Sequence, residues 1–100
     1  MDIQTKRGLL DVAVLSAIRY EDSYGYKIIK DIAPYVEISE STLYPILRRL
    51  EAQDMITVRM VEHSGRLRKY YRITPLGIAK IEKFRAEWRE IVSIYNFINR

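Results

Sequence analysis

The last quarter of the chain carries a repeat of apolar side chains that alternates between spacings of three and four residues. Such a heptad pattern places the apolar side chains along one side of a helix and is typical of helices that pair. Thr74 and Pro75 supply a cap and a first-turn proline, so we expect one helix of roughly 24 residues, about 36 Å long. A chain of 100 residues forms one small domain, which cannot bury the apolar side of that helix along its whole length. We therefore expect a second copy of the chain to pack against it. The repeat consists of Ile81, Phe84, Trp88, Ile91, Tyr95 and Ile98.

Two helices are expected before the middle of the chain. Residues Gly8–Ile18 are helical in period but apolar on nearly all sides, which is typical of a helix buried on two faces. Because the chain is small, one of those faces is expected to meet a partner. Asp22 and Ser23 are cap-type residues, and they predict a second helix that ends before Pro34.

A third helix is expected from about Ser39–Ser41 to Gln53. Three cap-type residues lie close together at its start, and Pro45 is expected in the first turn, where a missing amide proton costs least. Its apolar residues recur at the i, i+3, i+4, i+7 positions of an amphipathic helix. These residues are Leu43, Ile46, Leu47 and Leu50.

The pattern then changes from a helical period to alternation. In Met55–Glu62, every second residue from Ile56 to Met60 is apolar, and Leu67–Ile73 is also rich in strand-forming residues. A short loop with a glycine, His63–Arg66, separates the two segments. Two strands joined in this way predict a β-hairpin. Tyr71 is in phase with Ile73 and is expected in the core, which leaves Tyr70 nearer the surface.

The order of elements is three helices, a two-stranded hairpin and a long helix. It predicts a mainly α (α+β) fold, a winged helix-turn-helix with a long C-terminal dimerisation helix. Residues 1–74 are expected to form the DNA-binding domain and residues 75–100 the dimerisation helix, together as one compact unit. The expected dimer contacts come from the terminal repeat and from the first helix at Leu10 and Val14.

In helix-turn-helix proteins the second helix of the motif enters the major groove, and here that helix is the third of the chain. Once its apolar residues face inward, its outer side carries hydroxyls, a tyrosine and arginines, which suit phosphates and base edges. The alternative is an ordinary solvated helix face, and this helix alone does not decide between them. The candidate DNA contacts are Ser41, Thr42, Tyr44, Pro45, Arg48 and Arg49.

The hairpin favours DNA because basic residues crowd it. Arg66, Arg68, Lys69 and Arg72 occupy the loop and second strand, Arg59 lies on the first strand, and only Glu62 opposes them locally. Like charges on a hairpin repel unless an anion neutralises them, and a phosphate backbone is such an anion. The alternative is an edge hairpin whose basic residues merely prevent aggregation. The candidate wing contacts are Arg66, Arg68 and Lys69.

Composition narrows the classes of function. The formal net charge of +4 permits an anionic partner without choosing one. The absence of cysteine excludes disulfide scaffolds and thiolate zinc sites, and His63, the single histidine, has no second ligand beside it. We therefore expect no metal and no cofactor. No apolar run is long enough for a bilayer and the first residues lack the order of a signal peptide, so we expect a cytoplasmic protein without membrane contact.

No constellation of catalytic residues is present. The glycines are too far apart for a phosphate-binding loop, the serines lack a histidine base, and the acidic residues form no pair. We expect a binding protein and not an enzyme. The competing interpretation is a protein-interaction module. Its affinity for a partner would not fall steeply as salt is raised, whereas the affinity of a DNA-binding protein for a duplex would.

Two segments together resemble the paired signature of the PadR family of bacterial transcription regulators. They are Ser41–Glu51, with its Leu-Tyr pair, and Arg68–Gly77, with its Lys-Tyr-Tyr run. Tyr24-Gly25-Tyr26 also resembles the second helix of that family, and the similarity extends over roughly residues 8–98. The short C-terminal part is similar to the compact subfamily with one terminal helix. Asp54 is a departure, because the family usually has glycine there, and it bears on the turn after the third helix.

The resemblance implies a sequence-specific regulator that binds a pseudo-palindromic operator as a homodimer and represses nearby genes. It also implies that a ligand can bind in a flat apolar channel between the subunits. In multidrug-sensing members a tryptophan of the terminal helix lines that channel, and Trp88 falls at the matching place. A small aromatic effector is therefore expected at Trp88. The alternative is that Trp88 is only a packed residue of the heptad repeat.

Overall fold

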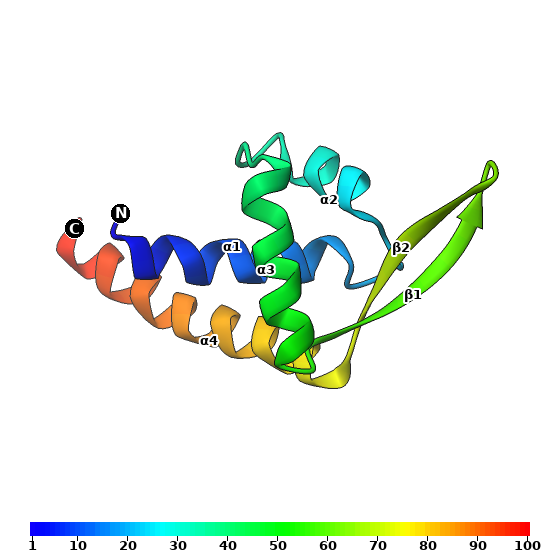
Figure 1. Cartoon of the computed structure of the whole chain (residues 1–100). Coiled ribbons are helices and arrows are strands. Elements are labelled where there is room, and N and C mark those ends of the chain that lie inside the picture. The colour runs from blue at the N-terminus through cyan, green and yellow to red at the C-terminus, as the bar shows by residue number, and fades with distance from the viewer.

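The computed structural model describes the whole chain, residues 1–100, as four helices and one antiparallel two-stranded sheet. The first three helices gather into one body and the hairpin projects from it (Figure 1). The last helix packs against the first only near its own start. This arrangement is the winged helix-turn-helix expected from the sequence. The elements are α1 (Ile3–Ala17), α2 (Gly25–Ile32), α3 (Glu40–Ala52), β1 (Ile56–His63), β2 (Arg66–Ile73) and α4 (Pro75–Ile98).

The core lies where α1, α2 and α3 meet the base of the hairpin. Each of the three helices contributes buried aliphatic side chains, and the hairpin adds Ile56 and Tyr71. Tyr71 is 5% exposed, which confirms its expected place in the core. Burial of this apolar surface fixes α3 against α1 and α2. The fully buried aliphatic residues are Val14, Leu15, Ile18, Ile28, Leu43, Leu47, Leu50 and Ile56.

The start of α1 and the cap of α2 differ from what the sequence indicates. In α1, the Asp2 carboxylate accepts a hydrogen bond from the Thr5 amide at 2.8 Å, so the helix starts five residues before the expected Gly8. The expected cap of α2 by Asp22 or Ser23 is wrong, because Tyr24 occupies the cap position without a side-chain hydrogen bond. Asp22 and Ser23 bond to the hairpin instead.

The third helix begins where expected, with one correction inside it. Ser39 is the cap, and its hydroxyl accepts from the Thr42 amide at 3.3 Å. Pro45 is the sixth residue of α3 and therefore lies in the second turn, not the first. Its side of the helix is exposed, so water can reach the carbonyl that lacks an amide partner.

The hairpin turn and the turn after α3 both use the left-handed backbone region. Ser64 and Gly65 have φ angles of 53° and 78°, which is the two-residue turn that matches the twist of paired strands. Asp54 has a φ angle of 59°. The amides of Asp54 and Met55 donate to the carbonyls of Glu51 and Leu50 at 3.0 and 2.9 Å, the pattern of a Schellman helix end.

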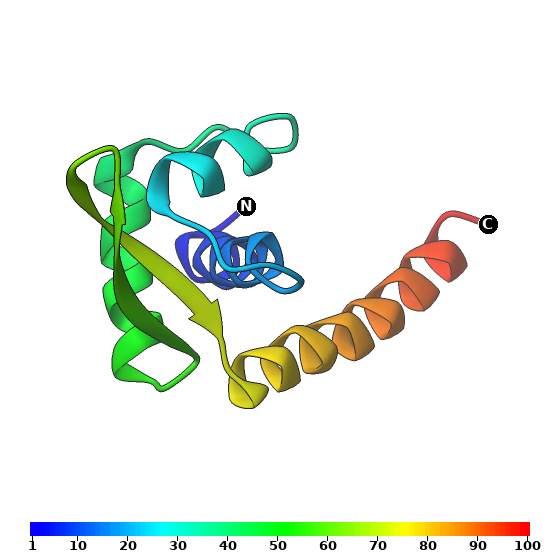
Figure 2. The same ribbon diagram turned by 90° about the vertical axis from the view of Figure 1, so that its right-hand side faces the viewer.

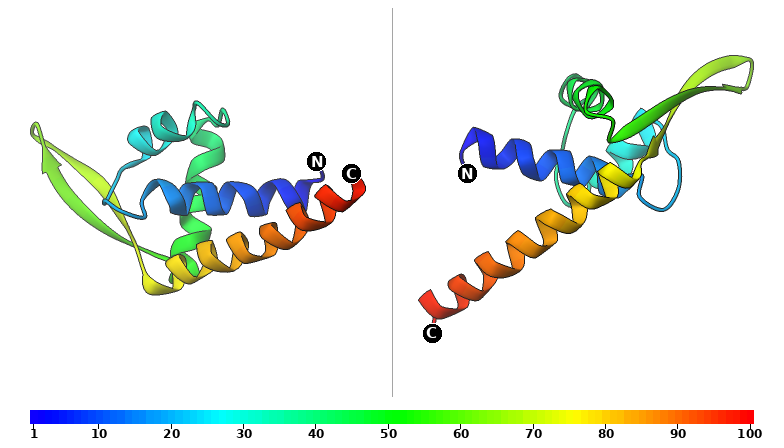
Figure 3. Two further views of the ribbon diagram at one scale, coloured as in Figure 1. Left: turned by 180° about the vertical axis from the view of Figure 1, so that it is seen from behind. Right: turned by 90° about the horizontal axis from the view of Figure 1, so that it is seen from below.

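The last helix leaves the body of the protein. The Thr74 hydroxyl caps it by accepting from the Gly77 amide at 3.2 Å, as expected, and Gly77 and Ile81 are its only buried residues. Every residue from Arg85 onward is exposed, and Figures 2 and 3 show this part of α4 diverging from α1. None of the four helices combines the length and apolar character that crossing a membrane requires.

Candidate nucleic-acid interface

The outer face of α3 presents a small polar surface to solvent. Ser41, Tyr44, Pro45 and Arg48 are all exposed there, and the Ser41 hydroxyl lies 2.8 Å from that of Ser39 at the start of the helix. Arg48 forms no ion pair within the chain. A free guanidinium on an exposed helix face can form paired hydrogen bonds to a guanine edge or bind a phosphate.

Arg49 is not on this outer face, contrary to the sequence-based expectation. Its guanidinium donates to the carboxylate of Asp11 in α1, and its side chain is 29% exposed. Asp11 is 5% exposed, and the Lys80 ammonium of α4 lies 4.0 Å from its second oxygen. A buried carboxylate needs such partners, so Arg49 joins α3 to α1 and is withdrawn from the candidate DNA contacts.

Strand register places four arginines on one face of the hairpin. Arg59 and Arg72 lie near its base and Arg66 and Arg68 nearer the turn, while Glu62 lies on the opposite face. Glu62 is the only acidic residue near these arginines in the sequence, but it lies on the other face and is not their counterion. The counterion is Asp22, whose carboxylate accepts from Arg59 Nη2 and Arg72 Nε, each at 3.1 Å.

The two arginines at the base of the hairpin thus share one carboxylate within the chain, which neutralises one of their two positive charges. Hydrogen bonding from Arg72, and next from Arg59, holds the pKa of Asp22 below its ordinary value. The same pairing raises the pKa of Arg72. Because Asp22 already binds both arginines, they do not require DNA as a counterion, and only the cations nearer the tip of the wing favour an anionic partner.

Cations nearer the turn have no acidic partner. Arg68 lies over the ring of Tyr24, 4.0 Å from its centroid, which is a cation–π contact that fixes the side chain without neutralising it. Arg66 and Lys69 are exposed and form no ion pair. Tyr70 is half-buried, with its ring 5.3 Å from that of Tyr24. The expected wing contacts Arg66, Arg68 and Lys69 are therefore all available to an anion.

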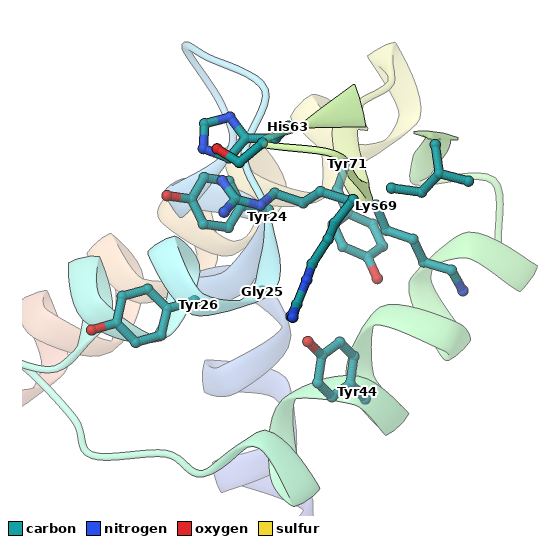
Figure 4. A pocket seen from close by; sticks show the side chains of 11 residues that line it. Tyr24, Gly25, Tyr26, Tyr44, His63, Lys69 and Tyr71 are labelled. Atoms are coloured by element: carbon teal, nitrogen blue, oxygen red, sulfur yellow. The ribbon is translucent and has the colours of Figure 1, made fainter. Parts of the chain in front are cut away.

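A groove of about 770 Å³ separates the wing from α2 and α3. Figure 4 shows Tyr44 and Tyr71 directed toward each other in this groove. Burial, and next the neighbouring Tyr44, raise the pKa of Tyr71, so the Tyr71 hydroxyl is a neutral hydrogen-bonding group. The groove brings together residues of three elements that are distant in the sequence. Its lining is Tyr24, Gly25, Tyr26, Tyr44, His63, Ser64, Arg66, Leu67, Arg68, Lys69 and Tyr71.

The close approach of Tyr44 to α2 was not expected from the sequence. A Cβ at Gly25 would lie 2.5 Å from the Tyr44 hydroxyl, so a larger residue here would require the end of the Tyr44 side chain to move away from the start of α2. Tyr44 therefore both faces the groove and spaces α3 from α2. The Tyr24-Gly25-Tyr26 sequence was the signal available for this contact.

The expected dimer residues fall into three groups by their exposure. Val14 and Ile81 are 0% and 3% exposed and belong to the protomer's own core, so they are withdrawn from the candidate interface. Leu10 and Phe84 are half-buried. The other four expected dimer residues, all on α4, are open to solvent: Trp88, Ile91, Tyr95 and Ile98, at 42%, 49%, 59% and 72% exposure.

His63 lies at the exposed tip of the wing. No group of three or more His, Cys, Asp or Glu side chains is placed to hold a metal ion. The groove beside the wing thus offers hydroxyls, a histidine and cations, which are groups that bind anions.

These features define a class of protein. A helix with an exposed arginine, a basic wing beside it and a groove lined by tyrosines and cations together form a winged helix-turn-helix DNA-binding surface. The free end of α4 lies on the other side of the molecule from α3 and the wing (Figure 2).

Comparison with known proteins gives the family. The model of the transcriptional regulator PadR-like family matches residues 14–83. A protein of Lysinibacillus sphaericus is 40% identical over 93 residues, covering 88% of this chain and 85% of its own length. The chain belongs to the PadR-like family of transcriptional regulators.

Two solved structures share the fold over nearly the whole chain. A PadR-like transcription factor of Bacteroides fragilis superposes with a TM-score of 0.85 at 31% identity, covering 95% of this chain and 94% of the other. A transcriptional regulator of Clostridium thermocellum superposes with a TM-score of 0.83 at 35% identity, covering 97% and 99%. The similarity includes the long C-terminal helix.

Proposed function

We propose that this protein is a ligand-responsive repressor that binds a pseudo-palindromic operator as a homodimer. The observation that carries the proposal is the placement of unpaired cations. Arg48 on α3 and Arg66 and Lys69 on the wing lie free of acidic partners, whereas Arg49, Arg59 and Arg72 are paired within the chain. Free cations placed on both the major-groove helix and the wing suit a duplex better than a protein partner.

In this proposal α3 enters the major groove. Arg48 contacts a base edge, and Thr42 and Tyr44 fix the start of α3 on the sugar-phosphate backbone. Ser41 and Pro45 lie beside these contacts on the same exposed face. The wing cations Arg66, Arg68 and Lys69 contact the DNA backbone next to the site that α3 reads. Phosphates of this backbone enter the groove beside Tyr44. Such backbone contacts add affinity without sequence preference.

The proposed dimer forms through the exposed apolar face of α4. Trp88, Ile91, Tyr95 and Ile98 together leave an apolar stripe in water, which is unusual for a monomer and is removed when two such helices pair. Leu10 and its neighbours on α1, with Tyr35 and Val36, line a separate apolar groove of about 630 Å³ that offers a further surface for a partner. The two recognition helices then meet successive major grooves about 34 Å apart.

An aromatic effector is proposed to bind beside Trp88. Its indole is stacked on Phe84, with centroids 5.8 Å apart and an interplanar angle of 12°, and its outer face is open. A planar ligand inserted between paired α4 helices favours one spacing of the two recognition helices and so changes operator affinity. Quenching of the fluorescence of this single tryptophan by planar aromatic compounds tests the site, and no response across a broad panel contradicts it.

Footprinting of the protein on the region upstream of its own gene tests the proposed function. The expected result is protection of two half-sites one helical turn apart, with transcription from that promoter lowered when they are occupied. Protection of a single isolated half-site contradicts the dimeric arrangement. Unchanged transcription at full occupancy contradicts repression.

A further inference from the structure

Beyond the base of the hairpin, one short segment connects the projecting strands to the rest of the domain through non-covalent contacts. This segment, residues 22–24, lies between α1 and α2. Ser23 exchanges backbone hydrogen bonds with Tyr71 at 3.1 and 2.7 Å, and the Tyr24 ring packs on Tyr70. The rest of the hairpin extends into solvent (Figure 1). The direction in which the wing points therefore depends on this segment.

Asp22 is the one side chain of this segment that binds both strands. Its carboxylate accepts from Arg59 on β1 at 3.1 and 3.3 Å and from Arg72 on β2 at 3.1 and 3.2 Å. The Asp22 side chain is only 19% exposed, against 55% and 65% for the two arginines. A carboxylate shared between two guanidinium groups makes charge-assisted bonds of defined direction, and here they cross from one strand to the other.

We propose that Asp22 is a positioning residue: it fixes the orientation of the wing and withholds Arg59 and Arg72 from DNA. The inference rests on the proposed DNA-binding function. Because Arg59 and Arg72 are paired with Asp22, the wing contacts phosphates only through the cations nearer its turn. The direction of the hairpin then determines which phosphates these cations reach. Asp22 thereby restricts the wing to the register in which α3 meets its bases.

Loss of the Asp22 charge has two separable effects. It releases two guanidinium groups, and each additional phosphate that they neutralise makes the slope of log affinity against log salt steeper by about 0.9. It also removes the tie between hairpin and loop, so the wing binds backbone in several orientations. We expect a slope steeper by up to about 1.8, and an operator-to-random affinity ratio lower by roughly tenfold.

The experiment compares the full-length protein with Asp22→Asn and a matched control, Asp31→Asn. Asp31 is also paired, with Lys27 at 2.9 Å, and its replacement changes the net charge equally without touching the wing. Affinity for the upstream duplex and for a random duplex of equal length is measured over a series of KCl concentrations. The proposal expects the steeper slope and lower ratio in Asp22→Asn alone, and identical values in the two variants overturn it.

A second pair of variants separates positioning from charge. Asp22→Glu keeps the charge, so we expect the same slope of log affinity against log salt as in the wild type. Its longer side chain changes the geometry of the two ion pairs, so we expect a partly lowered operator-to-random affinity ratio. Arg59→Gln combined with Arg72→Gln removes the tie without freeing cations, so a lower ratio without a steeper slope is expected. A ratio equal to that of the wild type in this double variant overturns the positioning role.

A measurement without DNA distinguishes failure of this inference from failure of the proposed function. The chain has no cysteine, so spin labels at Ser64→Cys on the wing and Lys83→Cys on α4 are specific. With labelled protein diluted in unlabelled protein, Asp22→Asn is expected to broaden the distance distribution and Asp31→Asn to leave it narrow. A narrow distribution in Asp22→Asn overturns the inference, whether or not the wild type binds a duplex.

Discussion

The guanidinium of Arg49 in the recognition helix donates to the nearly buried carboxylate of Asp11 in the first helix. The neighbouring Arg48 is exposed and unpaired. Two adjacent arginines thus have different tasks: Arg49 holds α3 to α1, and Arg48 is free for DNA. Lys80 of α4 approaches the same carboxylate, so three helices meet at Asp11.

Replacing Arg49 by alanine is expected to destabilise the fold. The substitution leaves the Asp11 carboxylate without its nearest donor, and an unsatisfied buried group of this kind costs about 1–3 kcal/mol. Urea unfolding at fixed protein concentration measures the change in the free energy of unfolding. Arg48→Ala is the matched control and should unfold like the wild type; equal unfolding of all three proteins contradicts the division of tasks.

Replacing Arg48 by alanine is expected to weaken operator binding by about 1–3 kcal/mol and to relax the preference for one base pair. The reason is the loss of a direct base contact by an unpaired guanidinium. Titration against operator duplexes that differ at single positions measures both effects. Unchanged affinity and base preference would remove Arg48 from the base contacts.

Replacing Asp54 by glycine is expected to stabilise the protein by up to about 1 kcal/mol. The left-handed region costs an ordinary L-residue roughly 1–2 kcal/mol, and the greater freedom of glycine in the unfolded chain offsets part of that gain. The residue has a φ angle of 59° at the end of α3, where a side chain is strained and glycine is not. The Thr74 hydroxyl bonds to the carbonyl of residue 54, and this bond survives the change. Asp54→Ala retains the Cβ and serves as the control, so a gain in its thermal stability equal to that of the glycine variant contradicts the explanation.

Replacing Ile91 by aspartate is expected to give folded monomers that bind the operator poorly. Ile91 is 49% exposed in the protomer, so its loss leaves the core intact but places a charge in the proposed helix pair. Sedimentation measures the oligomeric state. Ser93→Asp introduces the same charge on the opposite side of α4 and should remain dimeric; an intact Ile91→Asp dimer places the interface elsewhere.

Local patterns in the sequence predicted most of the fold. The heptad repeat, the Thr74-Pro75 start and the alternation after Met55 each depend on neighbouring residues, and α4 and the hairpin appear where these patterns place them. The expected cap of α2 is wrong because the Asp22 carboxylate binds two arginines of the hairpin instead of the helix start. Its partners Arg59 and Arg72 are 37 and 50 residues away, a distance at which no local pattern operates.

The site was predicted in outline and corrected where distant residues meet. Helical periodicity predicts Arg49 on the outer face of α3, but it does not show which flank of the helix packs against another helix. The available signal was Asp11, a lone acidic residue in an apolar segment, which requires a partner. Val14 was similarly misplaced because α1 is apolar on nearly all sides, and only the packed structure shows which face is buried.

The most direct test of the account is the affinity of the purified protein for its own upstream duplex as salt is raised. In the proposed complex an anionic polymer lies against the outer face of α3 and the unpaired wing cations. We predict tight binding at low ionic strength, and a logarithm of affinity that falls linearly with the logarithm of salt concentration, with a slope near −0.9 for each phosphate neutralised. Absence of binding to any duplex at low ionic strength contradicts it.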